Sequence, residues 1–445
     1  VHVRPHASIA SSNITHPNAS ENRFGSTTVL VSLPSVRLRF GCDARKGARL
    51  RQRVQSFSAV PRQPNRAPLC TSAPGETNAI APLVKQLQAA YPEQQFLVTT
   101  MTPTGSAQVQ ALLGDQVAHC YAPYDFPWAV RSFYARVQPK LLVLMETELW
   151  PNLIDVAAKS ELPVMLINAR LSERSARGYG RISALTRPML GQLSRVACQE
   201  TEHEVRFRSL GANTAGLSTL GSIKFDKALP VEQEAKVFAL TQQWQLAERW
   251  VWIAASTHPG EDEVVLSAHQ QLLAIVPNAL LLLVPRHPVR ADDVVHLAEQ
   301  AQLRVAKQTQ AEELTSDTIG GLQVLVADTM GQLQQLYGLA QVAFVGGSLV
   351  PMGGHDPIEA ALCRMPMVMG THRFNFPLVC ERFVAAGALE SADDAVALVG
   401  MLRRWYQDEG LRREQGEAAA EVVSLNTGAQ VRTFELLGDY LAALD

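Results

Sequence analysis

The chain of 445 residues has little that would indicate a disulfide framework, a membrane span or a nucleic-acid surface. Its six cysteines show no CxxC spacing, which argues against a zinc site and favours buried thiols in a reducing compartment. No apolar run approaches the roughly 18–20 residues that cross a bilayer, and the first residues lack the pattern of a signal peptide. The formal net charge is −2, so we expect no general attraction to nucleic acid.

What is present is the composition of a soluble α/β protein. Apolar residues make up 47% of the chain and charged residues 18%, enough apolar side chains for a full core. The length accommodates two ordinary globular domains and an additional segment.

Residues 1–74 differ from the rest of the chain. They contain eleven Lys and Arg against two acidic residues, and Ser, Pro and Arg dominate. One interpretation is a disordered segment, or a basic arm that lies on an anionic surface. The other is that this stretch is not the natural N-terminus, because the chain begins with Val and the Arg bias fits an out-of-frame translation. Both stay open, and we expect order to begin at Gly75.

From Gly75 onward, apolar runs of strand length alternate with segments of helical periodicity. The expected strands are 96–99, 141–145, 164–168, 196–199, 250–255, 280–284, 324–326, 342–345 and 366–369. Such alternation predicts parallel, doubly wound sheets in two Rossmann-like domains facing each other across a cleft. The pattern is less regular at 221–246, so we place a linker near Lys227–Pro230 and predict domains over 75–228 and 229–445.

Candidate catalytic residues of the first domain follow its expected strands or precede the linker. Glu146 and Glu148 come directly after an apolar run, and a carboxylate there is costly unless it is solvated, paired or used. The plain alternative is that one caps a helix near Pro151 while the other is solvated. On spacing alone, Glu76 at a helix start and Lys224 in a loop near the linker are ordinary surface residues.

A candidate phosphate site follows the expected strand 280–284 of the second domain. Its sequence is PRHPVR, in which Arg286 and Arg290 flank His287. Because Arg binds phosphate bidentately, a phosphate or nucleotide site is expected here, against the alternative of an ordinary helix-entry loop. After strand 324–326, Met330 and Gly331 offer backbone groups to a base edge, although a plain helix start gives the same pattern.

A glycine-rich loop follows the expected strand 342–345. It reads GGSLVPMGGHDPIE and runs from Gly346 to Glu359. Strand, glycine pair and helix start together present backbone N–H groups to an anion, and we expect Asp356 as the N-cap with Pro357 as the first helical residue. Glycine pairs also make plain surface turns. Glu359 lies where its carboxylate can reach a sugar hydroxyl.

Histidines do not indicate a metal site. His355 and His372 lack the HxxxH or HExxH spacing of metal ligands, and we expect both to be hydrogen-bonding residues. We therefore expect no metal and no other cofactor.

The motifs, taken in order, resemble the 3-deoxy-D-manno-octulosonic acid (Kdo) transferases of lipopolysaccharide biosynthesis, a family with the GT-B fold. The resemblance covers roughly residues 75–444 and is carried jointly by TMTPTGS, METELWPN, NARLSERSARGY, SIKFD, ASTHPGEDE, PRHP, ADTMG and GGSLVPMGGHDPIEA. It implies a metal-independent, inverting glycosyltransferase that moves Kdo from CMP-Kdo to a lipid A precursor (lipid IVA). It also implies a place at the cytoplasmic face of the bacterial inner membrane, peripheral or N-terminally anchored, with no anchor visible in this chain.

The resemblance assigns roles to individual residues. It implies that Glu76 is the general base, and that Glu146 and Lys224 stabilise the transition state. It further implies a donor site in which Pro285 and Arg286 hold the CMP phosphate. The other donor-site residues that it implies line cytidine or close over ribose and phosphate: Met330, Gly331, Gln332, Asp356, Pro357, Ile358 and Glu359.

The chain departs from the family pattern in places. Asp356 stands where the family has Asn, and Gln332 where it has Glu. The segment before Gly75 lacks the usual first-strand sequence and the apolar N-terminal helix. Alternatives to the Kdo transferase are another GT-B enzyme, such as a UDP-sugar transferase or an epimerase, and an inactive remnant with a damaged N-terminus.

Overall fold

The computed structural model describes residues 28–33, 36–41, 66–70, 74–311 and 316–442. The two interpretations of residues 1–74 fall mostly outside the described residues. Within that segment the structure has one antiparallel pair of strands, β1 (Thr28–Leu33) and β2 (Val36–Gly41), and the strand β3 (Arg66–Cys70).

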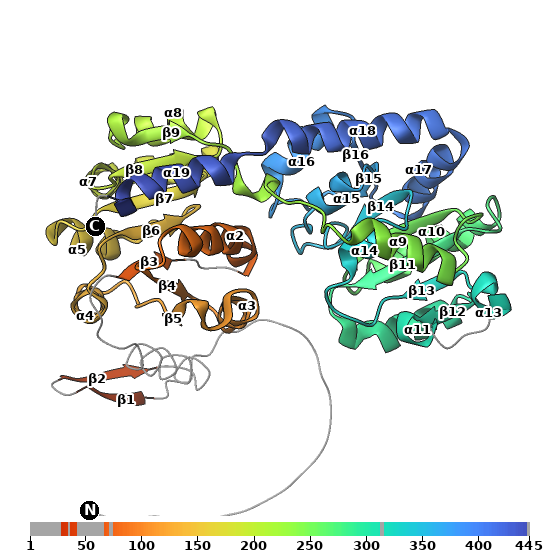
Figure 1. Cartoon of the computed structure of the whole chain (residues 1–445), viewed down its shortest axis with the longest axis horizontal. Coiled ribbons are helices and arrows are strands. Elements are labelled where there is room, and N and C mark those ends of the chain that lie inside the picture. The colour runs from red at the N-terminus through yellow and green to blue at the C-terminus, as the bar shows by residue number, and fades with distance from the viewer. Residues whose placement is uncertain (1–27, 34–35, 42–65, 71–73, 312–315, 443–445) are drawn as a thin grey trace, which may run out of the picture.

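Two parallel sheets of seven strands form the framework of the protein (Figure 1). The first has the order β5-β4-β3-β6-β7-β8-β9 and the second β12-β13-β11-β10-β14-β15-β16. We call the parts built on them the first half and the second half. The further strands of the first sheet are β4 (Gln95–Thr100), β5 (Ala118–Tyr121), β6 (Leu142–Met145), β7 (Val164–Ala169), β8 (Arg195–Cys198) and β9 (Leu217–Thr219). Those of the second are β10 (Val251–Thr257), β11 (Leu280–Pro285), β12 (Val305–Lys307), β13 (Val324–Val326), β14 (Val342–Val345), β15 (Met367–Met369) and β16 (Leu389–Ser391).

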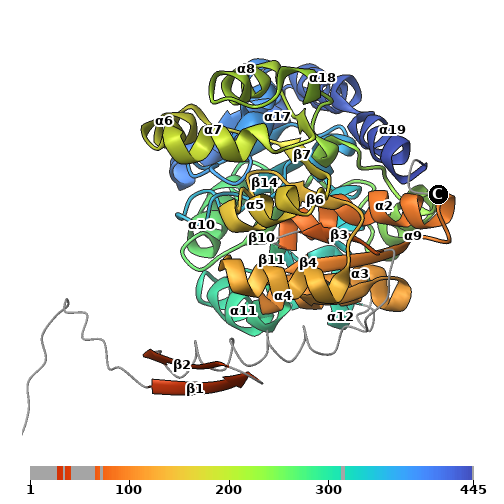
Figure 2. The same cartoon turned by 90° about the vertical axis from the view of Figure 1, so that its left-hand side faces the viewer.

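Helices cover both faces of each sheet, as Figures 1 and 2 show. In the first half these are α2 (Pro74–Ala90), α3 (Pro103–Leu113), α4 (Pro127–Val137), α5 (Pro151–Lys159), α6 (Glu173–Arg181), α7 (Ser183–Gly191) and α8 (Thr201–Ser209). The later helices are α9 (Gln233–Gln243), α10 (Asp262–Leu273), α11 (Ala291–Gln300), α12 (Gln308–Ala311), α13 (Ser316–Gly321), α14 (Leu333–Tyr337), α15 (Ile358–Leu362), α16 (Pro377–Ala385), α17 (Ala395–Gln407), α18 (Glu409–Asn426) and α19 (Ala429–Ala442). Short 3-10 turns lie at 114–116, 214–216, 223–225 and 288–290.

The sheets form because their central strands are apolar on both faces. Every residue of β6, β7 and β11 is buried, which is the pattern of strands covered by helices on both sides. Each face of each sheet has its own apolar cluster, and Trp252 and Trp405 are among the largest fully buried side chains of the second half. The sequence prediction of a doubly wound α/β fold is confirmed.

The strand order changes direction near the centre of each sheet, and these two points locate the candidate site. In the first sheet the change lies between β3 and β6, and in the second between β10 and β14. Ligands of doubly wound sheets bind beyond the carboxyl ends of the strands at such points. The described residues that follow the strands at these points are 74–76, 146–150, 258–261 and 346–359.

Strand β3 lies at the centre of the first sheet, between β4 and β6. Residues 66–70 belong to the basic segment 1–74, in which no strand of the sheet was predicted. The strand is defined by its pairing with two neighbouring strands: Leu69 pairs with Val98 of β4 and with Val143 of β6. The ordered part of the first half therefore includes a strand that precedes Gly75.

The chain crosses between the halves twice. It passes from β9 to α9 through residues 220–232, and it returns when α18 is followed by α19, which lies along the first half (Figure 1). Leu437 and Leu441 of α19 share an apolar cluster with Leu83 and Leu87 of α2. The division predicted at 228/229 assigns α19 to the second half, whereas the helix packs on the first. None of the helices that the structure describes is long and apolar enough to cross a bilayer.

Candidate active site

Glu146 stands at the carboxyl end of β6 with its carboxylate held between two cations. Its Oε1 lies 2.7 Å from Nζ of Lys224, and its Oε2 lies 3.1 Å from Nε of Arg170. The contact with Lys224 is a close ion pair rather than a well-aligned hydrogen bond. The residue is only 4% exposed and has a left-handed backbone with φ of 55°. A buried charge in a strained conformation is maintained by its partners, which is typical of a functional residue.

Lys224 is positioned by a short 3-10 turn over residues Ile223–Phe225. The backbone N–H of Ile223 donates to Oδ1 of Asn168, which also has a positive φ and is the penultimate residue of β7. The ammonium group lies 5.4 Å from the ring centroid of Phe376, which belongs to the second half. Lys224 therefore contacts both halves of the molecule.

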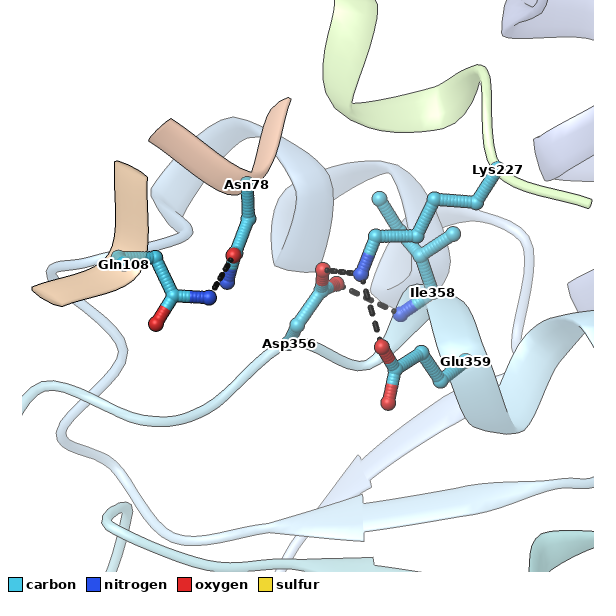
Figure 3. Close-up of polar contacts among 6 residues, drawn as sticks. All are labelled: Asn78, Gln108, Lys227, Asp356, Ile358 and Glu359. Atoms are coloured by element: carbon cyan, nitrogen blue, oxygen red, sulfur yellow. Dashed lines mark hydrogen bonds and ion pairs between the residues drawn. The ribbon is translucent and has the colours of Figure 1, made fainter. Parts of the chain in front are cut away.

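Glu76 lies in the first turn of α2, and its residue is partly exposed. The helix follows β3, the direct neighbour of β6, and it contacts the turn that carries Lys224. The structure thus places Glu76 and Glu146 after adjacent strands at one edge of the first sheet. Two residues further along α2, Asn78 accepts a hydrogen bond of 2.6 Å from Gln108 of α3 (Figure 3).

The loop after β14 does bind an anion, beginning at the second residue of its first glycine pair, but the anion belongs to the chain itself; the N–H of Gly346 donates to the carbonyl oxygen of Ala255. The fully buried carboxylate of Glu261 accepts hydrogen bonds of 2.7–2.9 Å from the backbone N–H groups of Gly347, Ser348 and Leu349. It also accepts from the N–H of His258. The expectation that these glycine N–H groups present themselves to a ligand is wrong, because Glu261 already satisfies them.

Gly346 allows the ends of β14 and β10 to approach each other closely. A Cβ at this position would lie 2.7 Å from the carbonyl oxygen of Ser256 and 2.9 Å from Cα of Thr257. Ser256 has a φ of 58°, so the chain turns sharply at the end of β10. This contact brings the 258–261 and 346–359 segments together.

Two histidines meet above this junction. Nε2 of His258 and Nε2 of His355 are 2.9 Å apart, and the rings are stacked. Burial lowers the pKa of His355 to about 4, with further lowering by the charge of Arg286. The pKa of His258 is also lowered, chiefly by burial. His355 is thus a hydrogen-bonding residue, as expected, and the described residues contain no cluster of three or more potential metal ligands.

The two arginines after β11 are used differently. Arg290 donates to the carbonyl oxygen of Thr257 and forms an ion pair with the buried carboxylate of Asp262, so it is a structural residue. Arg286 follows the buried Pro285; its residue is exposed, and its guanidinium has no ion pair among the described residues. Of the two cations expected at this edge, only Arg286 is available to a ligand.

The segment after β13 offers backbone groups as expected. Met330 is 72% exposed, and Gly331 has a φ of 82°. Gln332 occupies the N-cap position of α14, where its side-chain oxygen accepts from Gln308. Helix α14 begins at Leu333 and ends at Tyr337.

Asp356 and Glu359 are both paired with Lys227, a lysine of the linker (Figure 3). Oδ1 of Asp356 accepts a 3.0 Å hydrogen bond from the N–H of Ile358, but Asp356 lies one residue before the N-cap, so the prediction of Asp356 as the N-cap is wrong. Helix α15 begins one residue later than predicted, at Ile358, with Pro357 in the N-cap position. Because α15 has only five residues, its dipole contributes little to the binding of an anion.

Comparison with known proteins shows the family. A family model described as 3-deoxy-D-manno-octulosonic-acid transferase (kdotransferase) matches residues 48–227. A 3-deoxy-D-manno-octulosonic acid transferase of Haemophilus influenzae is 39% identical over 426 residues, which cover 94% of this chain and 98% of the relative. The chain belongs to the Kdo transferase family. A second Kdo transferase, of Bordetella pertussis, is 35% identical and covers 84% of this chain and 89% of its own.

The solved structures agree with the GT-B fold of a Kdo transferase. A glycosyltransferase from Rickettsia africae superposes with a TM-score of 0.55, covering 85% of this chain and 99% of its own. Its sequence identity is 12%, so the likeness concerns the fold alone.

Three residues of this Kdo transferase were missed by sequence reasoning: Arg170, Lys227 and Glu261. Arg170 lies in the quoted NARLSERSARGY motif directly after β7, and its position after a buried strand was a usable signal. Glu261 lies at the start of α10, and nothing in its spacing indicates the loop that it binds. Lys227 lies about 130 positions from its partners, so no local pattern connects them.

Proposed function

We propose that this Kdo transferase moves Kdo from CMP-Kdo to a lipid A precursor, with inversion at the anomeric carbon. The observation that carries the proposal is Glu146, buried in a left-handed conformation between Arg170 and Lys224 at the switch point of the first sheet. Lys224 also contacts Phe376 of the second half, where Arg286 is available to a phosphate. Membership of the Kdo transferase family supports this substrate class.

In the proposed reaction Glu76 is the general base. Its carboxylate takes the proton of an acceptor sugar hydroxyl as the hydroxyl oxygen forms a bond to the anomeric carbon of Kdo. The bond between that carbon and the phosphate oxygen breaks at the same time, and CMP leaves with the electron pair. Glu76 suits this role because its helix follows β3, the neighbour of the strand that Glu146 follows, and contacts the turn that carries Lys224.

Glu146 and Lys224 act as the electrostatic pair of the site. Positive charge develops on the sugar ring and negative charge on the leaving phosphate, so opposite charges at fixed positions stabilise both. The hydrogen bond of Asn168 to the turn and the contact of Arg170 with Glu146 fix these groups before the substrate arrives. No proton has to leave either residue during the transfer.

The donor site in this proposal lies in the second half. Arg286, beside Pro285, binds the CMP phosphate, and the exposed backbone at Met330, Gly331 and Gln332 lines the cytidine. The segment Asp356–Glu359, with Pro357 and Ile358, closes over ribose and phosphate. We propose that no metal takes part, because the cations Arg286 and Lys224 supply the required positive charge.

A lipid acceptor would bring the enzyme to the cytoplasmic face of the inner membrane. In this proposal residues 75–228 receive the acceptor and residues 229–445 receive the donor.

Donor competition tests the nucleotide. We expect CMP to bind the full chain in isothermal titration calorimetry and to raise its unfolding temperature, while UDP at the same concentration does neither. Binding of UDP without binding of CMP would contradict the proposal and favour a UDP-sugar enzyme of the same fold.

A further inference from the structure

Lys227 connects the linker to the loop that follows β14. Its Nζ lies 2.6 Å from Oδ2 of Asp356 and 3.0 Å from Oε1 of Glu359 (Figure 3). The three side chains are only 20–28% exposed, so bulk water screens these contacts incompletely. This pairing is distinct from the Glu146 cluster and has no part in the reaction steps above.

The neighbouring residue fixes the position of Lys227. Both carboxylate oxygens of Asp226 accept backbone hydrogen bonds at the start of α19, from Gly428 and from Gln430. Arg432 of the same helix donates to the carbonyl oxygen of Leu220 at the other end of the linker segment. Lys227 therefore extends from a tethered backbone, and its ammonium group is held over the loop.

Two carboxylates three residues apart make this loop anionic in the absence of Lys227. These charges also act on α14. Burial raises the pKa of Tyr337, and the negative charges of Glu359 and Asp356 raise it further. Burial by itself would lower the pKa of Lys227, but the charges of Asp356 and Glu359 outweigh it and raise that pKa. The lysine is therefore charged at every pH at which the protein works, and the cluster carries a net charge of −1 instead of −2.

An anionic loop would repel the donor that the proposed function assigns to it, since CMP-Kdo carries a phosphate and a sugar carboxylate. We propose that Lys227 is a positioning residue for the donor: it neutralises Asp356 so that the loop tolerates the phosphate, and it holds Glu359 in place for the ribose. This inference rests on the proposed function for the identity of the nucleotide.

A double-mutant cycle on the full chain tests this role, with CMP as the probe in calorimetry. We expect Lys227→Met to weaken CMP binding about tenfold or more, because it leaves two partly buried carboxylates uncompensated. Asp356→Asn alone should bind CMP at least as tightly as the wild type, since it removes a negative charge beside the phosphate while the amide oxygen still accepts from Ile358. Adding Asp356→Asn to Lys227→Met should restore most of the lost affinity, which a merely structural loss would not do.

Two further variants control the charge and the fold. Lys236→Met removes an equivalent positive charge from the exposed face of α9, where Lys236 pairs only with Glu232 of the described residues, and we expect unchanged affinity. Lys227→Arg keeps the charge and should retain CMP binding even if Lys227→Met unfolds. Equal affinities of wild type and Lys227→Met, or a double variant as weak as Lys227→Met, would overturn the role of Lys227 alone. Failure of the wild type to bind CMP would overturn the proposed function as well.

Discussion

Arg286 and Arg290 show how little residue type says about role at this site. They lie four positions apart after the same strand, yet Arg290 is engaged by Asp262 and the carbonyl of Thr257, whereas Arg286 faces solvent. The same contrast separates the glutamates: Glu261 satisfies backbone N–H groups and Glu146 balances two cations. The contacts that each side chain makes within the protein, rather than its residue type, determine whether its charge is available to a substrate.

Replacing Glu76 with Ala should abolish transfer, because no other group is assigned to take the acceptor proton. CMP binding should be nearly unchanged, since the donor site lies in the second half. Activity assays and calorimetry on the same preparation check this, with Glu93→Ala at the exposed end of the segment after α2 as a control that keeps its activity. Equal loss of activity and CMP binding would make Glu76 a structural residue.

Replacing Arg286 with Ala should weaken CMP binding by roughly 1.5–3 kcal/mol, the contribution of hydrogen bonds to a charged group. Protein stability should hardly change, because the guanidinium has no ion pair among the described residues. Arg403→Ala, on the exposed surface of α17, removes the same charge elsewhere and serves as the control. Unchanged affinity measured by calorimetry would remove Arg286 from the donor site.

At the scale of elements, the loop after β14 is built around Glu261. Its carboxylate reaches from the start of α10 across to four backbone N–H groups, three of them consecutive. A buried N–H group without a hydrogen-bond acceptor costs free energy, so the Glu261 side chain stabilises the first residues of the loop after β14 in this conformation.

Glu261→Ala should therefore lower the stability of the second half by about 3 kcal/mol or more, because several buried donors lose a charged acceptor together. Urea unfolding followed by tryptophan fluorescence measures this, since Trp244, Trp252 and Trp405 are buried in that half. Glu263→Ala, which removes a single exposed capping contact with Gly260, is the matched control. Similar losses in the two variants would contradict the account of the loop.

Strands with long apolar runs were predictable from the sequence, and edge strands were not. All the predicted strands are present. Five strands of the two seven-stranded sheets were missed: β5, β9, β12 and β16 lie at edges, and β3 lies at the centre of the first sheet. Edge strands are short and partly exposed, as β9 and β12 show, so they lack a continuous apolar pattern. The candidate residues followed from strand ends and the family motifs, whereas Lys227 and Glu261 act through contacts about 90–130 positions away, which no local spacing reveals.

At the scale of the whole molecule, the two halves are joined by charges as well as by the chain. Arg382 of α16 forms an ion pair with Glu200 after β8, and it lies over the ring of Phe225. The contact of Lys224 with Phe376 also joins the two halves, and Lys224 is one of the proposed catalytic residues. Donor binding and the relative position of the halves are therefore expected to influence each other.

Acid should destabilise the molecule well before its carboxylates are protonated. Burial lowers the pKa of His203, His269 and His355 to about 4, whereas the unfolded chain binds these protons near pH 6.5. The unfolded state thus binds more protons between these values, so stability falls as the pH decreases from about 6.5 to about 4. For His269, which accepts from Trp252, the shift corresponds to about 3 kcal/mol.

Thermal unfolding between pH 4 and pH 7 measures this loss. His269→Gln should be less stable at pH 7 but less sensitive to acid, while His296→Gln on the exposed face of α11 should keep the wild-type pH dependence. A wild-type stability that does not change between pH 6.5 and pH 4.5 would contradict the neutral state of the buried histidines.

The most direct test of the proposed function is mass spectrometry of a lipid A precursor incubated with the full chain and CMP-Kdo. The account predicts that the lipid gains the mass of one or more Kdo residues, that CMP is released in equal amount, and that Glu76→Ala forms no such product. A wild-type chain that is folded and binds CMP yet leaves the precursor unchanged, or that transfers a sugar from a UDP donor instead, would contradict it.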